Sequence, residues 1–296
     1  MLTLRSILCA VDFSDQSRDA LRWAVAIATQ HRSRVTVFTA VDPLLAEAAR
    51  ARLYMDLAKT DTEPALREFV SSTLSGSTGG PEVSFDVRVG HASELILEAA
   101  AREVDLVVMG THGLGGFRKL LLGSTTERVL RRARTSVLAV PPARVHAIVP
   151  GTDGPRLDVK CILAGTDFSE ASAKAVRYAA AWAQHLGVPL VVSHVVTPIV
   201  VPSRWQPYAA DMDEERVRSA EARCTSLAAT NTVAIRCETV VSIGRPAESL
   251  AATAEERQAG MIVVGLMGEE AGGARPGSIA YRVLCLAHVP VLVVPI

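Results

Sequence analysis

The chain has 296 residues, which at about 150 residues per domain argues for two domains. Lys and Arg together number 31, as do Asp and Glu, so the formal net charge is zero. A neutral chain with 4% aromatic residues lacks the basic surface and stacking platform of a nucleic-acid binder. Its 49% hydrophobic residues exclude disorder as the main state.

Signals for membranes and secretion are not found in the sequence. No apolar run approaches the roughly 18 residues of a membrane helix, and the N-terminus reaches Asp12 too early for a secretory signal peptide. The five cysteines contain no CxxC pair, which disfavours a disulfide framework and a cysteine zinc site. We therefore expect a cytoplasmic protein with reduced thiols and with neither a membrane nor a nucleic acid as partner.

The second half of the chain repeats the first. The segment Ile7–Ser14 returns at Ile162–Ser169, 155 positions further on. The segment Ser136–Pro141 returns at Pro290–Pro295, now 154 positions further on. One residue is therefore missing from the second copy before this last segment. A period of this length is a whole domain rather than a solenoid repeat.

The repeat sets the predicted domain boundaries. We expect one domain at residues 1–143 and a second at residues 159–296. Between them, Pro142–Val159 carries Pro150, Gly151, Gly154 and Pro155, a composition typical of a flexible joint.

In chain order, the first half alternates short apolar runs with helical stretches. The apolar runs predict strands at Ser6–Val11, Arg34–Val41, Val83–Val89, Asp105–Met109 and Ser136–Val140. Helices are predicted at Ser17–His31, over most of Ala46–Thr73, at Ala92–Glu103 and at Ser124–Arg134. Such continuously apolar strands are typical of a parallel sheet covered on both faces. Each half is predicted to be a doubly wound α/β domain with strand order 3-2-1-4-5 and a crevice between the carboxyl ends of strands 1 and 4.

The connection after the fourth strand carries the candidate binding motif. The common phosphate-binding patterns G-x-G-x-x-G and G-x-x-x-x-G-K-[ST] are missing, the first from the turn after strand 1 and the second from the whole chain. Glycines stand instead at Gly110, Gly113 and Gly123. Ser124 and Glu127 form a capping box that predicts a helix start there, and free N–H groups at such a start attract anions. An ordinary connecting loop with a capped helix remains the alternative.

These residues resemble the universal stress protein family, and the resemblance covers both halves. The family pattern G-x2-G-x9-G-[ST] is met by Gly110, Gly113, Gly123 and Ser124. The flanking Met109, His112 and Thr126, and the Val11-Asp12-Phe13-Ser14 segment after strand 1, are also similar to nucleotide-binding members. The resemblance implies a Rossmann-like fold, ATP (or AMP or ADP) in the crevice, and dimers joined through the edge strand.

The resemblance also implies roles for individual residues. Val11 and Asp12 would flank the adenosine, and Ala40 would line the adenine pocket. Gly110 and Gly113 would approach the ribose and phosphates. Gly123, Ser124, Thr125 and Thr126 would cradle the phosphates.

The second half departs from the pattern. Gly265 and Gly268 are followed by only eight residues before Gly277, and that stretch contains Glu269 and Glu270. Ala280 stands where the first half has Thr126. The acidic residues would repel phosphate, so we expect one competent nucleotide site, in the first half, and a weakened or empty one in the second. Asp167 and Val195 remain at the adenosine end.

Other candidate residues point to binding rather than catalysis. Asp12 and Asp15 could hold Mg²⁺ beside bound phosphates, although Asp15 better suits the start of a helix. His112 is expected to shape the loop. The remaining histidines show no metal spacing, and no Ser-His-Asp or Cys-His set can be assembled. We therefore expect a regulatory protein rather than an enzyme, with slow ATP hydrolysis left open.

The final strands of the two halves complete the sequence-based expectations. Ser136–Val140 and Pro290–Val294 would both be exposed edges in isolated domains, and such edges invite pairing. We expect them to pair within the chain as a pseudo-dimer, with a homodimer of two chains also open. The leading interpretation is a nucleotide-binding protein of the stress response, and the alternative is a nucleotide-independent interaction protein of the same fold.

Overall fold

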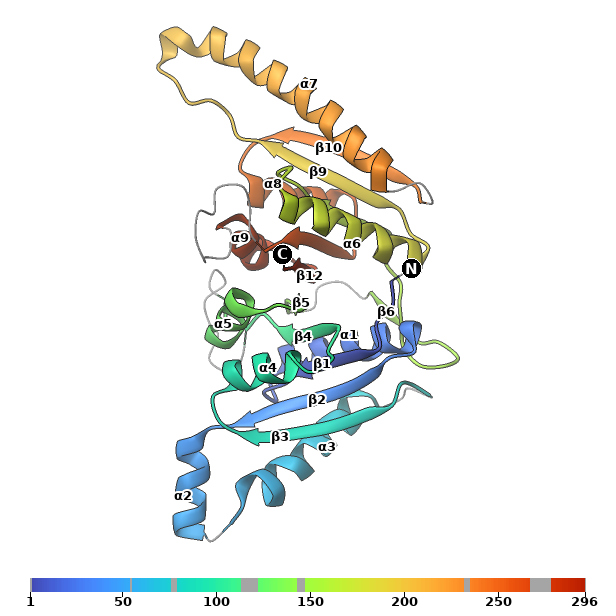
Figure 1. The fold of residues 1–296 in the computed structure, drawn as a ribbon, viewed down its shortest axis with the longest axis vertical. Helices are drawn as coiled ribbons and strands as arrows, with labels where there is room; N and C mark the ends of the chain where they lie inside the picture. Colours follow the sequence, from blue (N-terminus) through green and yellow to red (C-terminus); the bar gives the residue numbers. More distant parts are fainter. Residues whose placement is uncertain are drawn as a thin grey trace. The chain divides into compact units, whose positions relative to one another are not determined.

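The computed structural model describes residues 2–53, 55–75, 79–112, 122–142, 147–231, 235–266 and 278–295. Contacts divide the chain into two compact units, an N-terminal unit (Thr3–Asp158) and a C-terminal unit (Val159–Ile296). Both are drawn in Figure 1. The predicted linker therefore lies within the N-terminal unit as far as Asp158.

The N-terminal unit is a parallel sheet covered by helices on both faces. Its strands are β1 (Ser6–Ala10), β2 (Arg34–Val41), β3 (Val83–Val89), β4 (Leu106–Gly110) and β5 (Ser136–Val140). They pair in the order β3-β2-β1-β4-β5, which confirms the predicted topology. The main covering helices are α1 (Asp15–His31), α3 (Glu63–Thr73), α4 (Ala92–Ala100) and α5 (Ser124–Arg132). Helices α1 and α3 pack together on one face, and α4 and α5 on the other.

The first crossover shows why the sequence folds in this way. Ser14 caps the start of α1 by accepting a hydrogen bond from the backbone of Ser17. The apolar positions Leu21, Ala24 and Ala28 recur at helical spacing and are fully buried against the sheet. Each large apolar side chain buried in this way contributes about 1.5–3 kcal/mol. The neighbouring strands are also buried, because helices cover both faces of a parallel sheet.

The long helix expected over Ala46–Thr73 is divided in the structure. It comprises α2 (Pro43–Leu53), a π-helical turn η1 (Ala58–Thr62) and α3. Only α3 has a clear apolar face, which it buries. In α2, Leu44 is 77% exposed and Leu53 is 66% exposed. The expectation of one mostly helical stretch was right in kind, but it missed that only its last part covers the sheet.

The linker is more ordered than its composition suggests. Strands β6 (Ile148–Val149) and β7 (Arg156–Leu157) form an antiparallel ribbon that packs on α1. The backbone N–H of Leu157 donates to Oε1 of Gln30 at 3.2 Å. Gly154 has a φ of +124°, and a Cβ there would lie 3.0 Å from Cα of Gly80. The glycines that we took as a sign of a flexible joint therefore form a tight turn. The prediction of a flexible joint is wrong for residues 147–158.

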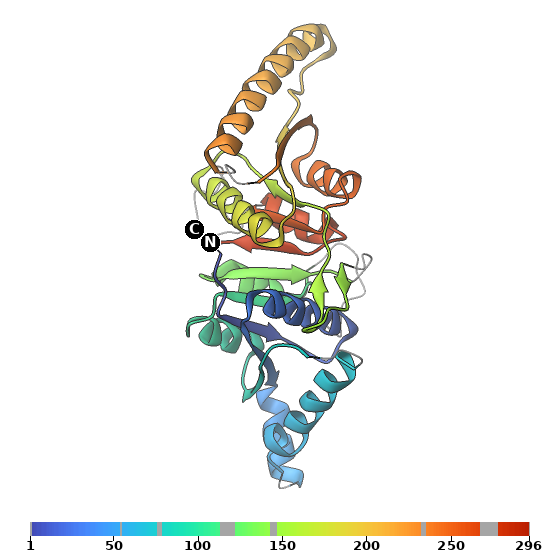
Figure 2. The ribbon, with the colours of Figure 1, turned by 90° about the vertical axis from the view of Figure 1, so that its right-hand side faces the viewer.

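The C-terminal unit repeats the architecture. Its strands β8 (Ile162–Gly165), β9 (Leu190–Val196), β10 (Cys237–Ile243), β11 (Met261–Gly265) and β12 (Val291–Val294) pair in the order β10-β9-β8-β11-β12. Its helices are the short η2 (Ser203–Trp205), α6 (Glu170–Leu186), α7 (Gln206–Asn231), α8 (Pro246–Glu256) and α9 (Ser278–Leu286). Helix α7 lies along β9 and β10 (Figures 1 and 2). Among the residues described above, no helix has the length and apolarity needed to span a bilayer.

Candidate functional site

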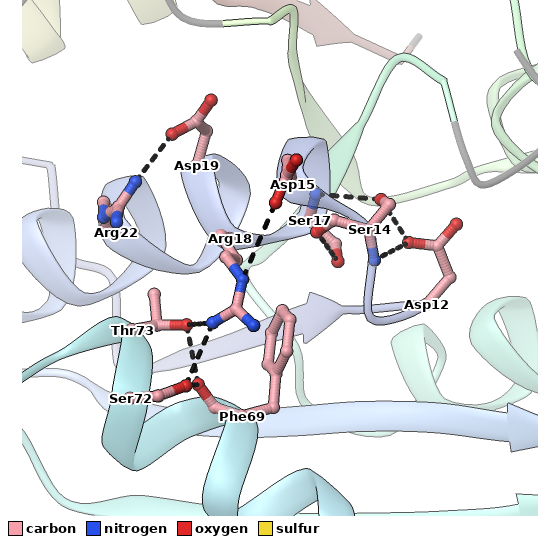
Figure 3. Close-up of polar contacts among 10 residues, drawn as sticks. All are labelled: Asp12, Ser14, Asp15, Ser17, Arg18, Asp19, Arg22, Phe69, Ser72 and Thr73. Carbon is pink, nitrogen blue, oxygen red and sulfur yellow. Dashed lines mark hydrogen bonds and ion pairs between the residues drawn. The ribbon is translucent and has the colours of Figure 1, made fainter.

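The turn after β1 holds Asp12 in a fixed position. Its Oδ1 accepts hydrogen bonds from the backbone N–H of Ser14 at 3.1 Å and from the Ser14 hydroxyl at 2.5 Å. The Ser14 hydroxyl oxygen in turn accepts from the N–H of Ser17 at 3.2 Å, as Figure 3 shows. Phe13 takes the left-handed conformation, with a φ of 65°. The side chain of Asp12 is thus locked to the start of α1 at the carboxyl edge of the sheet.

A second set of contacts ties this turn to α3. The ring of Phe13 meets that of Phe69 edge-on, with centroids 5.5 Å apart. The guanidinium of Arg18 lies 4.4 Å from the centre of the Phe69 ring and donates to the hydroxyls of Ser72 and Thr73 at 3.0 and 2.9 Å (Figure 3). These contacts immobilise the turn from the outside. Sequence reasoning missed Arg18 and Phe69 because nothing in a helical pattern indicates which residues of two helices meet.

The end of β2 lies beside the same turn. The backbone N–H of Val11 donates to the carbonyl of Phe38, and the buried hydroxyl of Thr39 donates to the carbonyl of Val11, both at 2.9 Å. Ala40 follows directly and is half-buried, in register with Arg88 of β3. The structure therefore places Val11, Asp12 and Ala40 at neighbouring positions on the carboxyl edge.

Gly110 brings the end of β4 against the start of α1. A Cβ at Gly110 would lie 3.3 Å from Cβ of Gln16 and 3.2 Å from the carbonyl of His112. A side chain here would separate the two connections, so the glycine allows β4 and α1 to meet. Met109, the preceding residue, is 4% exposed. It belongs to the strand core, so a contact with ligand would have to be made by its backbone.

Hydrogen bonds join the two ends of the glycine-rich connection. The N–H of Gly123 donates to the carbonyl of Thr111 at 2.8 Å. The hydroxyl of Thr126, which is 3% exposed, donates to the carbonyl of Gly110 at 2.8 Å. Thr126 therefore ties the first turn of α5 to the end of β4. Gly113 lies outside the described residues, as does the connection from 113 to 121.

Helix α5 begins at Ser124, as predicted, but the predicted capping box is wrong. Gly123 is the N-cap, and no side chain caps the helix. The carboxylate of Glu127 instead meets Arg131 one turn further on, at 2.5 Å. Without a side-chain cap, the first N–H groups of α5 keep their capacity to bind an anion. Beside them, the residue Ser124 is exposed and Thr125 is half-buried.

His112 and Asp15 each contact a residue close to them in the sequence. Nδ1 of His112 lies 2.9 Å from the hydroxyl of Thr111, beside the strand. Asp15 is in the first turn of α1 with its side chain 98% exposed, 3.8 Å from Arg18 (Figure 3). A carboxylate there favours the helix N-terminus. Over the described parts of the chain, no group of three or more His, Cys, Asp or Glu could hold a metal ion.

The C-terminal unit repeats the turn that holds Asp12, here called the aspartate turn, with Asp167 in its place. A residue beside the turn differs. Oδ1 of Asp167 accepts from the N–H and hydroxyl of Ser169 at 3.0 and 2.5 Å. His194 occupies the position of Thr39, and its Nδ1 lies 2.8 Å from the carbonyl of Thr166. Its ring lies 4.5 Å from that of Phe168. Burial lowers the pKa of His194, and Arg223 and Arg216 lower it further, against the opposing Thr166 bond and Asp167.

In the C-terminal unit, the residue at the position of Thr126 cannot form the hydrogen bond that ties α5 to β4. Ala280 is buried in α9 where Thr126 stands in α5, so no hydroxyl can reach the end of β11 from that position. A Cβ at Gly265 would lie 2.9 Å from the backbone of Ala171, so packing against α6 requires a glycine at this position. The acidic stretch with Glu269 and Glu270 lies outside the described residues. The weakened second site therefore stays a prediction.

The strand orders define a protein with two doubly wound α/β domains in tandem. The connections at the carboxyl edge of the first sheet place a candidate anion site at the start of α5. The profile described as the universal stress protein family matches residues 3–141 and 159–295. The chain therefore belongs to the universal stress protein family, with two copies of its domain.

Individual relatives agree with this assignment. A universal stress protein of Mycolicibacterium smegmatis is 28% identical over 299 residues, covering 97% of this chain and 96% of the relative. A universal stress protein of Thermus aquaticus is 35% identical over 137 residues, covering 46% of this chain and 98% of the relative. The crystal structure of a universal stress protein from Archaeoglobus fulgidus matches with a TM-score of 0.61 at 18% identity, covering 99% of this chain and 97% of that one. The last similarity shows the fold alone.

Proposed function

We propose that the N-terminal unit binds an adenine nucleotide, ATP or its relatives AMP and ADP, and that binding serves a regulatory role in a stress response. The observation that carries this proposal is the uncapped start of α5, which Thr126 ties to Gly110 at the end of β4, where Gly110 packs against Gln16 of α1. Adenosine would lie at Val11, Asp12 and Ala40.

The helix start suits the phosphates because backbone N–H groups and the helix dipole both favour negative charge. Asp12 is held by Ser14 in a fixed orientation, and a fixed acceptor can select a base without losing conformational entropy on binding. Mg²⁺ would enter with the phosphates rather than occupy a site built by the protein.

We propose binding without fast turnover. Of the residues at this edge, Asp12 is engaged with the turn and His112 lies beside Thr111. We therefore assign both side chains to the local structure of their turns rather than to a catalytic base. A nucleotide that binds only the folded state would stabilise the unit by mass action and so act through its stability or its partners.

The test quantifies the nucleotide released when the purified full chain is denatured, by mass spectrometry. We expect one adenine nucleotide per chain. Ser124→Glu places a carboxylate at the first position of α5, where it suits the helix dipole but repels phosphate. We expect this variant to fold normally and to release none.

Ser278→Glu is the matched control, because Ser278 begins α9 in the C-terminal unit. It should leave the nucleotide content unchanged. Two nucleotides per chain, with one lost in each variant, would refute the single-site proposal. No nucleotide in the native protein and no thermal shift with Mg-ATP would favour the nucleotide-independent interaction protein. Pairing of the final strands within the chain stays a prediction. A homodimer also stays a prediction, which light scattering of the native chain checks.

A further inference from the structure

Two cysteines of the C-terminal unit lie in the interface between α7 and β10. Cys224 is on α7 and is 0% exposed. Cys237 is the first residue of β10 and is half-buried. Helix α7 packs along this strand, and neither cysteine is in a disulfide in the structure.

The alternation of the strand shows which way Cys237 faces. Its neighbour Glu238 forms an ion pair at 2.5 Å with Arg257, which ends α8 on the opposite face of the sheet. Successive side chains of a strand point to opposite faces. Cys237 therefore faces α7, from which the buried side chain of Cys224 is directed toward the sheet.

The two thiols are close enough to affect each other's ionisation. Burial raises the pKa of Cys224 to about 11, and a thiolate at Cys237 adds to this rise, whereas Arg223 opposes it. Cys224 is thus shielded from an oxidant in solution, and the more accessible Cys237 would meet that oxidant first.

We propose that a peroxide oxidises this pair to a Cys224–Cys237 disulfide, which fastens α7 to β10. In the first step the Cys237 thiolate attacks the O–O bond of hydrogen peroxide. This gives a sulfenic acid and, after uptake of a proton, one water. In the second step the sulfur of Cys224 attacks the sulfenic sulfur, loses its proton and displaces a second water. The two sulfurs lose two electrons and the peroxide gains them.

The remaining cysteines are placed differently. Cys9 is fully buried in β1, in the other unit. Cys161 lies on the α8 side of the sheet, where its Sγ is 3.4 Å from the carbonyl of Arg257. Burial raises the pKa of both thiols. The fifth cysteine, Cys285, is half-buried on α9. We expect all three to remain reduced when the pair is oxidised.

The experiment treats the full chain with hydrogen peroxide, blocks the remaining thiols under denaturing conditions, and maps the peptides without reductant. We expect one peptide pair linked through Cys224 and Cys237, an intact mass lower by two hydrogen atoms before blocking, and three blocked thiols of the original five. Thioredoxin or a small thiol should reverse all three changes. Hydrogen exchange along α7 should slow in the oxidised protein, because the new bond opposes local opening.

Variants separate the two roles. In Cys224→Ser, the sulfenic acid of Cys237 should persist and be trapped by dimedone. In Cys237→Ser, dimedone should label neither position. Cys161→Ser is the control and should form the disulfide as the native chain does.

Three results would overturn the proposal. One is a different disulfide, within or between chains. Another is conversion of native Cys237 to sulfinic acid while Cys224 stays reduced. The third is a chain whose five thiols all remain after treatment that oxidises a small dithiol. Nucleotide content does not enter these outcomes, so the proposal stands or falls apart from the proposed function.

Discussion

Thr126→Val removes the hydrogen bond that joins α5 to β4 and keeps the shape of the side chain. The hydroxyl is buried and donates to the carbonyl of Gly110 at 2.8 Å. The hydrogen bond itself is part-buried, so losing it costs about 0.5–1.5 kcal/mol. For a unit of this size we expect a fall in Tm of roughly 1–6 °C.

The same variant should weaken nucleotide binding beyond its effect on stability. Thr126 fixes the uncapped helix start relative to Gly110, and a misplaced anion site loses affinity even when the unit is folded. We expect a Kd for Mg-ATP raised by about tenfold, which corresponds to roughly 1.4 kcal/mol. Differential scanning calorimetry measures the first effect, and isothermal titration at a temperature well below Tm measures the second.

Thr29→Val is the matched control. The Thr29 hydroxyl donates to the carbonyl of Val25 one turn earlier in α1, an acceptor already used by the helix. We expect a Tm change well below that of Thr126→Val and an unchanged affinity. Equal effects of the two variants on Tm and on affinity would refute the assigned role of Thr126.

Further predictions concern the glycines and the histidine. Gly265→Ala should destabilise its unit by about 1–3 kcal/mol in urea unfolding, since its Cβ would lie 2.9 Å from the backbone of Ala171. Gly110→Ala should cost less, because its nearest contacts are 3.2 and 3.3 Å, and an equal or greater cost would contradict this reasoning. The pKa of His194 is lowered in the folded protein, whereas in the unfolded chain it is about 6.5. Just below pH 6.5 the unfolded chain therefore binds more protons than the folded protein. The stability of the C-terminal unit should therefore be full above that pH and fall as the pH drops below it, and His194→Thr should remove this slope in Tm measured from pH 7 to 5. A slope unchanged by the substitution would assign the proton uptake to another group.

The fold could be predicted from the sequence because each local signal agrees with the global architecture. The strand at Arg34–Val41 was predicted with the bounds that the structure shows, and so were Val83–Val89 and Ser136–Val140. Buried parallel strands are short, apolar and bounded by polar residues, so their ends are easy to see. Where packing rather than periodicity decides, prediction failed. The hydrophobic pattern alone could not show that α2 extends away from the sheet. Nor could it show that the linker glycines form the turn between β6 and β7, which pack on α1.

The candidate site was only partly predictable for a different reason. A glycine spacing shows where the backbone must turn, but it does not show where a hydroxyl points. Thr126 was expected to face phosphate and is seen donating to Gly110, while the expected cap by Ser124 is taken by Gly123. Thr39 escaped notice because a threonine in a strand is ordinary. Comparing the two halves could have drawn attention to it, since His194 stands at the same position in a mostly apolar strand.

That comparison also separates what the fold needs from what a ligand would need. The aspartate turn is the same in both units, with Asp12 and Asp167 each accepting from the serine two residues on. It starts a helix in each case, so this turn by itself does not distinguish one unit from the other. The tie from Thr126 to Gly110 occurs in the N-terminal unit, and Ala280 in the other cannot form it. If fold alone maintained these residues, both units would be free to lose this tie. The halves therefore differ at the proposed phosphate end as well as at Thr39 and His194, and the proposed nucleotide would need the Thr126 tie in the N-terminal unit alone.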